Sequence, residues 1–188
     1  MDASLADPWT PAVDFDSLST RRLLLRRFVD ADLEPFLAMR ADPEVARYQG
    51  WQGFTRADAE AFVARCHLAD PDTPGQWFQF AIELDGEFVG DCACFTPAQP
   101  PGEAELGVTL APAHQGQGIA REALRRLMRW LIEERRKTRL RAVVDARNPS
   151  ALRLFEGLGF VRHSQEEVIF KGEPCVEVTL VAEPGSST

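Results

Sequence analysis

The sequence predicts an α/β (α+β) fold in which one mixed, mostly antiparallel sheet carries helices on both faces. A chain of 188 residues suits one domain built around one core. Stretches that alternate apolar and polar residues are interleaved with stretches whose apolar residues recur at helical spacing. The order of these stretches is strand, two helices, three strands, helix, strand, helix and two strands, which is typical of a sheet with helices packed on its faces.

The N-terminal third is expected to hold a tail, one strand and two helices. Thr55 and Asp58 form a capping-box start for the second helix, because each side chain can bond the other residue's backbone N–H. Gly- and aromatic-containing residues 48–54 separate the two helices. The expected elements are a tail over 1–19, a strand over 20–28, a helix from Asp30 to Asp42 and a helix over 55–68.

The rest of the chain alternates strands with two further helices. Asp85-Gly86 is typical of a tight hairpin turn between two strands. Asn148-Pro149 supplies the N-cap and first residue that a helix start prefers. With a polar tail over 183–188, the folded domain is expected over 20–182. The expected strands are 77–84, 87–95, 104–110, 140–144, 166–170 and 175–181, and the expected helices are 120–131 and 149–157.

Composition narrows the function classes. The formal net charge is -8 and the pI is near 5.0, which argues against direct binding to nucleic acid or to anionic lipid. No apolar run approaches the roughly 18 residues of a membrane helix, and no secretory leader is recognisable, so a cytoplasmic location is expected. The four cysteines have neither CxxC spacing nor a nearby His pair, and we expect no metal.

The segment from Leu110 to Ala120 is the strongest functional signal. A strand ends there, Gly116 and Gly118 open a tight loop, and an amphipathic helix begins at once. Free N–H groups and the helix dipole make such a start an anion site, and glycine lets a diphosphate approach closely. Arg121 stands where a dinucleotide fingerprint needs its third glycine, and the Lys of a P-loop is missing, so nicotinamide and nucleoside triphosphate cofactors are disfavoured.

Two motifs resemble one enzyme family. Gln115-x-x-Gly118-x-Ala120 resembles the acyl-CoA diphosphate motif of the GCN5-related N-acetyltransferases (GNAT), and Asn148-x-x-Ala151-x-x-x-Phe155 resembles that family's segment after its fifth strand. The opening segment 20–26 and the segment 104–108 are similar to the corresponding segments of the branch that includes ribosomal-protein N-terminal acetyltransferases (RimJ/RimL-like). The resemblance implies a sheet splayed at the acyl-CoA site, acetyl-CoA as co-substrate and N-acetyltransferase activity.

The resemblance also implies residue roles. Asn148 would bond the pantetheine region, or it could serve only as the cap of its helix. Many relatives have a Tyr where this chain has Phe155, and that Tyr can protonate the departing thiolate, so the general acid stays open here. The residues implied in acetyl-CoA binding are Val108, Leu110, Gln115, Gly116, Gln117, Gly118, Ile119, Ala120, Asn148 and Phe155.

Glu105 is the candidate general base. It lies on the strand face opposite Leu106 and Val108, so it can point into a cleft while its neighbours fill the core. An amine must be neutral to attack a thioester, and a carboxylate acting through water can assist its deprotonation. A solvated carboxylate, or an anchor for a charged substrate, is the alternative role.

The acceptor is expected to be an amine, either a peptide N-terminus or a small amine such as a polyamine or an antibiotic. Tyr48, Trp51 and Phe54 could line its pocket, or they could simply anchor their loop to the core. A non-catalytic acyl-CoA-binding module is the alternative function. The protein is expected to be a monomer or a homodimer.

Overall fold

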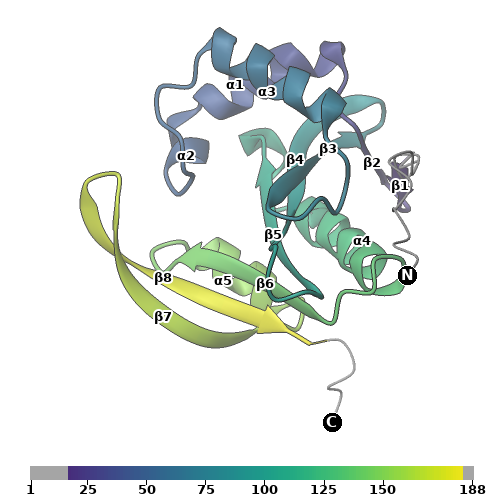
Figure 1. The fold of residues 1–188 in the computed structure, drawn as a ribbon. Coiled ribbons are helices and arrows are strands. Elements are labelled where there is room, and N and C mark those ends of the chain that lie inside the picture. The colour runs from purple at the N-terminus through teal and green to yellow at the C-terminus, as the bar shows by residue number, and fades with distance from the viewer. Residues whose placement is uncertain (1–16, 184–188) are drawn as a thin grey trace, which may run out of the picture.

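The computed structural model describes residues 17–183 and forms one eight-stranded sheet with helices on both faces (Figure 1). The strand order is β1-β2-β3-β4-β5-β6-β8-β7. Every neighbouring pair is antiparallel except β5 and β6, which are parallel. The predicted fold class is therefore confirmed. None of the helices in the described part of the chain is long and apolar enough to cross a membrane.

The N-terminal part differs from expectation in two respects. A short helix over Pro43–Ala46 follows the helix expected to end at Asp42, because the Asp42 side chain caps it by accepting from the Glu44 and Val45 backbone N–H groups. The strand expected over 20–28 is shorter and is preceded by a second strand, because Thr20 turns the chain by donating through its backbone N–H to the Leu23 carbonyl at 2.9 Å. Residues 17–19, assigned above to the tail, form the first of these strands, whereas residues 1–16 lie outside the described chain. The elements are β1 (Ser17–Ser19), β2 (Leu23–Arg26), η1 (Asp30–Asp32), α1 (Leu33–Ala41), α2 (Pro43–Ala46) and α3 (Arg56–Leu68).

The capping box predicted for α3 is present. The Thr55 hydroxyl accepts from the Asp58 backbone N–H at 3.3 Å, and the Asp58 carboxylate accepts from the Thr55 backbone N–H at 2.8 Å. The second helix therefore begins where the local sequence satisfies its free N–H groups.

The sheet strands follow the predicted alternation. Asp85 and Gly86 both have positive φ, 53° and 84°, as a two-residue hairpin turn between β3 and β4 requires. β7 and β8 are longer than expected. β7 begins at Val161, where it already pairs with Val181, and β8 begins at Glu173, directly after the turn at Lys171 and Gly172. The elements are β3 (Gln76–Leu84), β4 (Glu87–Thr96), β5 (Glu103–Leu110), η2 (Pro112–His114), α4 (Ile119–Glu133), β6 (Arg139–Asp145), α5 (Pro149–Glu156), β7 (Val161–Phe170) and β8 (Glu173–Ala182).

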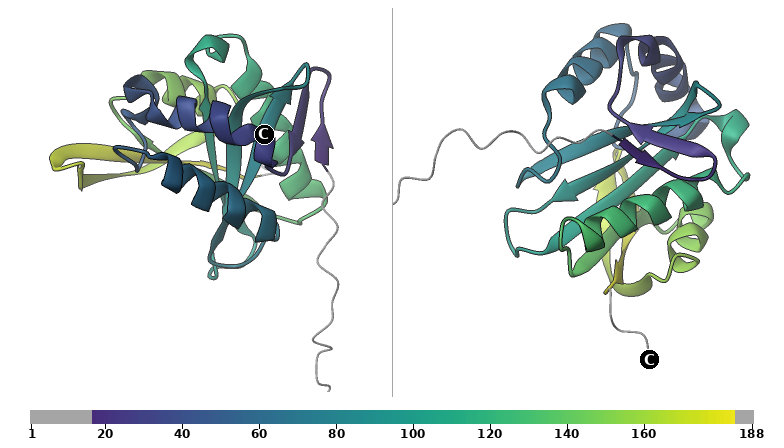
Figure 2. Two further views of the ribbon diagram at one scale, coloured as in Figure 1. Left: turned by 90° about the horizontal axis from the view of Figure 1, so that it is seen from above. Right: turned by 90° about the vertical axis from the view of Figure 1, so that its right-hand side faces the viewer.

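Helices cover both sides of the sheet (Figure 2). The buried apolar residues form two hydrophobic clusters. The larger one packs α4 and α5 against the strands through residues such as Phe80, Leu127 and Leu140, all fully buried. The smaller one packs α1 and α3 around Phe28 and Phe36, whose rings meet edge to face at 5.3 Å. The sheet is therefore covered by one helical layer on each side, α4 and α5 on one and α1 and α3 on the other.

Candidate active site

The ladder between the parallel strands β5 and β6 ends early. β5 continues to Leu110 and β6 to Asp145, but in the described chain no further pair joins the two strands. Backbone groups along the facing edge of β5 therefore lack ladder partners there. This separation is the splay that the resemblance implied, and Val108 and Leu110 both lie in it. The three pairs that do form are Glu103 with Arg139, Ala104 with Leu140, and Glu105 with Arg141.

Two glutamines shape the loop that follows β5. Gln115 Nε2 donates to the Leu110 carbonyl at 3.1 Å, and Gln117 Nε2 donates to the Ala113 carbonyl at 2.8 Å. Arg22 Nη1 donates to the Gln117 carbonyl at 3.2 Å. The side-chain amides thus hold the loop in shape from within, a role that the sequence analysis did not consider beside donation to a ligand.

The loop leaves the start of α4 open. Gly116 and Gly118 have φ of 72° and 76°, and Gly118 is the N-cap residue. No side chain in the described chain caps this helix start. Ile119 is fully buried and Ala120 packs against the larger core cluster, so only their backbone N–H groups face the loop. The arrangement offers an anion several free N–H groups and the positive end of a 15-residue helix.

The start of α5 is closed by its own cap. Asn148 Oδ1 accepts from the Ala151 backbone N–H at 3.1 Å, which confirms the capping interaction and leaves the Asn148 amide nitrogen as a donor. Phe155 is 4% exposed, and its ring lies 5.2 Å from that of Phe160 in the larger cluster. Phe155 therefore contributes apolar packing and carries no proton that it could transfer.

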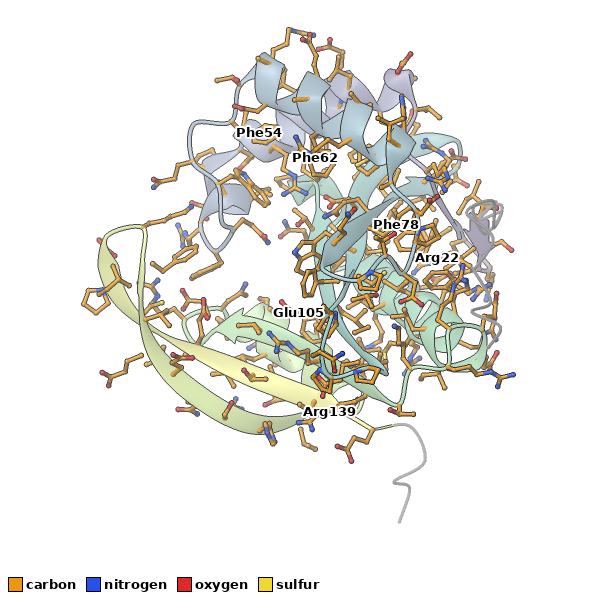
Figure 3. All side chains as sticks on the ribbon, in the orientation of Figure 1. Arg22, Phe54, Phe62, Phe78, Glu105 and Arg139 are labelled. Carbon is orange, nitrogen blue, oxygen red and sulfur yellow. The ribbon has the colours of Figure 1, made fainter. Side chains whose placement is uncertain are left out.

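Glu105 occupies the last paired position before the strands separate. Arg141 Nε donates to Glu105 Oε2 at 2.9 Å, and Arg141 Nη2 lies 2.7 Å from the same oxygen. Oε1 has no hydrogen-bond partner in the described chain. Figure 3 labels Glu105 on β5, between the helical layer that carries Phe54 and Phe62 and the strand end at Arg139. The carboxylate is therefore oriented by an ion pair and keeps one oxygen for a ligand or a water.

On the sheet face that carries Glu105, the neighbouring positions hold small residues. Gly107 follows on the same face, and a Cβ placed there would meet no heavy atom within 4 Å. Its ladder neighbour Ala93 is opposite Gln79, whose Oε1 is buried without a hydrogen-bond partner in the described chain. Space and an unused acceptor atom thus lie beside the separated strands.

A buried ion pair that the sequence analysis missed stands on the same face. Arg40 Nη2 donates to both Asp91 oxygens, at 2.9 and 2.8 Å, and the two side chains are 7% and 4% exposed. Burial raises the pKa of Asp91 and lowers the pKa of Arg40, and the attraction between the charges opposes both shifts. A charged residue inside the otherwise apolar strand Val89 to Cys94 was the available signal.

The aromatic loop anchors itself to this ion pair. Trp51 Nε1 donates to the Arg40 carbonyl at 3.0 Å, and the Arg40 guanidinium lies 3.7 Å from the centre of a Trp51 ring. The Phe54 ring is 5.7 Å from Phe36 and 6.4 Å from Trp51. Tyr48 is half-buried nearby in sequence. The anchoring role, one of the two that the sequence left open, is thus visible for Trp51 and Phe54.

The β7–β8 hairpin reaches back to the helical layer. Lys171, at its tip, donates through Nζ to the Ala46 carbonyl at the end of α2, at 2.6 Å. In Figure 1 the hairpin curves away from the sheet towards α2. The Glu105 face is thus bordered by the α1–α3 layer and by this hairpin.

A family model for the acetyltransferase (GNAT) domain matches residues 22–161. N-acetyltransferase p20 of Bacillus licheniformis, itself uncharacterised, is 30% identical over 148 residues, which cover 77% of this chain and 82% of that protein.

Two solved structures from Vibrio cholerae show the same fold. A protein proposed to be a ribosomal-protein-serine acetyltransferase has a TM-score of 0.76 at 24% identity, covering 91% of this chain and 98% of that one. A spermidine N-acetyltransferase in complex with CoA and spermine has a TM-score of 0.74 at 21% identity, covering 87% and 96%. With a model that matches most of its length, the chain belongs to the GNAT family of N-acetyltransferases.

Proposed function

We propose that this protein transfers the acetyl group of acetyl-CoA to a primary amine by direct attack of the amine on the thioester. The observation that carries the proposal is the uncapped start of α4 beside the separated strands β5 and β6. A diphosphate needs N–H donors and a positive dipole end, and an extended pantetheine arm needs a free strand edge. Both features occur here next to each other, in a member of an acetyltransferase family.

The coenzyme is proposed to run from the helix start into the splay. Its diphosphate would accept from the backbone N–H groups of residues 116–120, with Gln115 and Gln117 holding the loop. Its pantetheine arm would lie along Val108 and Leu110, with the Asn148 amide as a further donor. That path brings the thioester towards Gly107, where the structure has open space on the Glu105 face.

The reaction then needs a neutral amine and a leaving thiolate. The amine nitrogen attacks the thioester carbonyl, a C–N bond forms, and collapse of the tetrahedral intermediate breaks the C–S bond. The amine proton leaves through Glu105 Oε1 or a water held by it, and the CoA thiolate takes up a proton from water. Phe155 cannot supply that proton, but a thiol of pKa near 8.5 leaves as a thiolate without strong assistance.

Charge on the acceptor side favours a cationic substrate. Asp145 on β6, Glu177 on β8 and Glu166 on β7 are directly opposed in the ladders, so their side chains form a row on the same sheet face as Glu105. Arg147 pairs with Asp145 at 2.7 Å, while Glu177 and Glu166 face each other with no cation between them in the described chain. Opposed like charges cost stability unless a cation joins them.

A peptide N-terminus is the proposed acceptor, with polyamines as the second candidate. An α-amine is neutral in roughly one molecule in ten at pH 7, and a lysine amine in about one in two thousand, so an α-amine demands less of Glu105. The carboxylate row and the spermine bound by the Vibrio cholerae relative support the second candidate.

An acceptor panel tests the proposal. Release of free CoA from acetyl-CoA is measured with peptides whose α-amine is free or blocked, each with and without lysine, and with a panel of polyamines and aminoglycosides. Turnover of free α-amines alone supports the peptide acceptor. Turnover of polyamines alone moves the assignment to the second candidate, and binding of acetyl-CoA without turnover on any amine would favour a non-catalytic acyl-CoA-binding module.

A further inference from the structure

A cationic groove runs along the outer face of α4. It encloses about 630 Å³ and is bordered by the β1–β2 turn on one side, with Gly118 at its edge. The right-hand view of Figure 2 shows this face of α4 between the β1–β2 strands and α5. Five arginines line the groove, and we call it the arginine groove: Arg21, Arg121, Arg125, Arg126 and Arg129.

Glu122 is the one carboxylate among the described residues that line the groove, and it is already engaged. Glu122 accepts from the Thr20 hydroxyl at 2.7 Å and from Arg22 Nε at 2.7 Å. These bonds tie α4 to the β1–β2 turn, and Arg22 is not among the lining residues. Among the described residues that line the groove, no carboxylate is therefore left to balance its positive charge.

Among the described residues, only Arg126 of these five arginines has an acidic side chain within ion-pair distance. Arg126 lies 4.0 Å from Glu134, and its pKa is lowered by burial and by the nearby charge of Arg129. For Arg21, Arg121, Arg125 and Arg129 the described chain provides no carboxylate within ion-pair distance. Clustered like charges in a protein of net charge -8 favour the binding of an anion.

The groove is continuous with the helix start. Arg125 lies six residues beyond Ile119, which is about 9 Å along the axis, and helical side chains point back towards the N-terminus. An extended arginine side chain spans much of that distance, so the Arg125 guanidinium can reach the first turn. Arg121 belongs to that turn, and its guanidinium lies beside Gly157 at the end of α5. Both side chains are solvent-exposed.

We propose that the arginine groove binds the 3′-phosphate of acetyl-CoA, with Arg121 and Arg125 as its charged partners. This inference rests on the proposed function, since it requires the diphosphate at the start of α4. Beyond the diphosphate, CoA carries an adenosine whose 3′-phosphate is a dianion. A planar guanidinium pairs with two phosphate oxygens at once, so arginines suit this group.

Dephosphorylated coenzyme tests the site. Dissociation constants are measured by calorimetry at low salt for acetyl-CoA and for acetyl-3′-dephospho-CoA, which lacks only the phosphate in question. The wild-type protein is expected to bind acetyl-CoA about 100-fold more tightly, roughly tenfold for each charge-assisted contact. Arg125→Gln should reduce this ratio about tenfold by weakening acetyl-CoA alone. Adenosine 3′,5′-bisphosphate should compete with acetyl-CoA for the wild-type protein.

A matched control is Arg56→Gln, an exposed arginine on α3 that pairs with Glu34 and should keep the wild-type ratio. Thermal unfolding confirms that each variant folds. A wild-type ratio near one, or a ratio that Arg125→Gln and the double variant Arg121→Gln/Arg125→Gln leave unchanged, overturns the phosphate site. Equal binding of both thioesters leaves the proposed transferase standing, whereas binding of neither would remove both proposals.

Discussion

Helices α3 and α4 begin in opposite ways. At α3 the side chains of Thr55 and Asp58 satisfy the free N–H groups of the first turn. At α4, which packs six residues into the core, a glycine in a left-handed conformation takes the cap position, and no side chain of residues 17–183 caps the N–H groups of the first turn. A cap is typically worth about 1 kcal/mol. The central helix forgoes that stability where a ligand could supply the missing acceptors.

Filling the open start of α4 with a side chain should have the largest effect on acetyl-CoA binding. Gly118→Val forces a β-branched residue to φ near 76° and places a side chain beside the free N–H groups. We expect KM for acetyl-CoA to rise about 100-fold, which corresponds to the loss of one or two hydrogen bonds to the charged diphosphate. Steady-state kinetics on a variant whose folding is verified by circular dichroism measures this. An unchanged KM would remove the diphosphate from this loop.

A substitution at Glu105 should lower the reaction rate without changing coenzyme binding at the start of α4. Glu105→Gln keeps the shape of the side chain and removes its charge, so kcat should fall about 100-fold, the low end of the range for general base catalysis. The loss should be largest at low pH, where the amine is mostly protonated. Acetyl-CoA binding should stay near wild type. Equal activity from pH 6 to pH 9 would exclude Glu105 as the base.

The start of α5 lies between the two extremes, because Asn148 can both cap and bind. Asn148→Asp keeps the oxygen that accepts from Ala151 and removes the amide donor. We expect wild-type stability and about a tenfold higher KM for acetyl-CoA, the cost of one hydrogen bond. Asn148→Ala removes the cap as well as the donor, so it should lower stability and also raise KM for acetyl-CoA. If Asn148→Asp matches wild type in both measurements, Asn148 serves only as a cap.

The closed helix start should affect stability alone. Thr55→Ala removes the hydroxyl cap of α3 and should cost about 1 kcal/mol. For a protein of this size that lowers Tm by about 2–4 °C. Differential scanning calorimetry measures the shift, and KM for acetyl-CoA should not change. A rise in this KM would mean that α3 contributes to the coenzyme site.

The smallest expected effect is a pH dependence of that cap. The Thr55 hydroxyl and backbone N–H lower the pKa of Asp58 below its usual 3.8. A carboxylate whose pKa is lowered by folding contributes stability above its unfolded pKa and loses it as pH falls through the folded value. The stability gap between wild type and Thr55→Ala should therefore narrow below pH 3.8. A gap that widens at low pH would contradict the capping box.

Features written in short stretches of sequence could be predicted. The Thr55–Asp58 box, the Asp85-Gly86 turn and the alternation on β3, β5 and β6 each depend on residues a few positions apart, so local rules were sufficient. The open start of α4 was likewise predictable from two glycines and the amphipathic run that follows. The roles of the ligand-facing residues stay predictions.

Features that depend on distant residues could not be predicted. Glu122 bonds Arg22 across 100 positions, and Arg40 bonds Asp91 across 51. The neighbouring sequence does not indicate which residues will pair, since burial and charge pairing are properties of the folded chain. The same holds for Arg141, which orients Glu105 from 36 positions away. The arginine groove, too, exists only once the β1–β2 turn lies beside α4.

The last strand of the sheet order, β7, bears on how the protein behaves in storage. As an edge strand of ten residues it presents unpaired backbone groups together with exposed Val161 and Ile169. Such edges pair with other chains unless charges keep copies apart, and Glu166 and Glu167 occupy the middle of this one. High salt screens that repulsion. Concentrated stocks should therefore stay clear longest at low ionic strength.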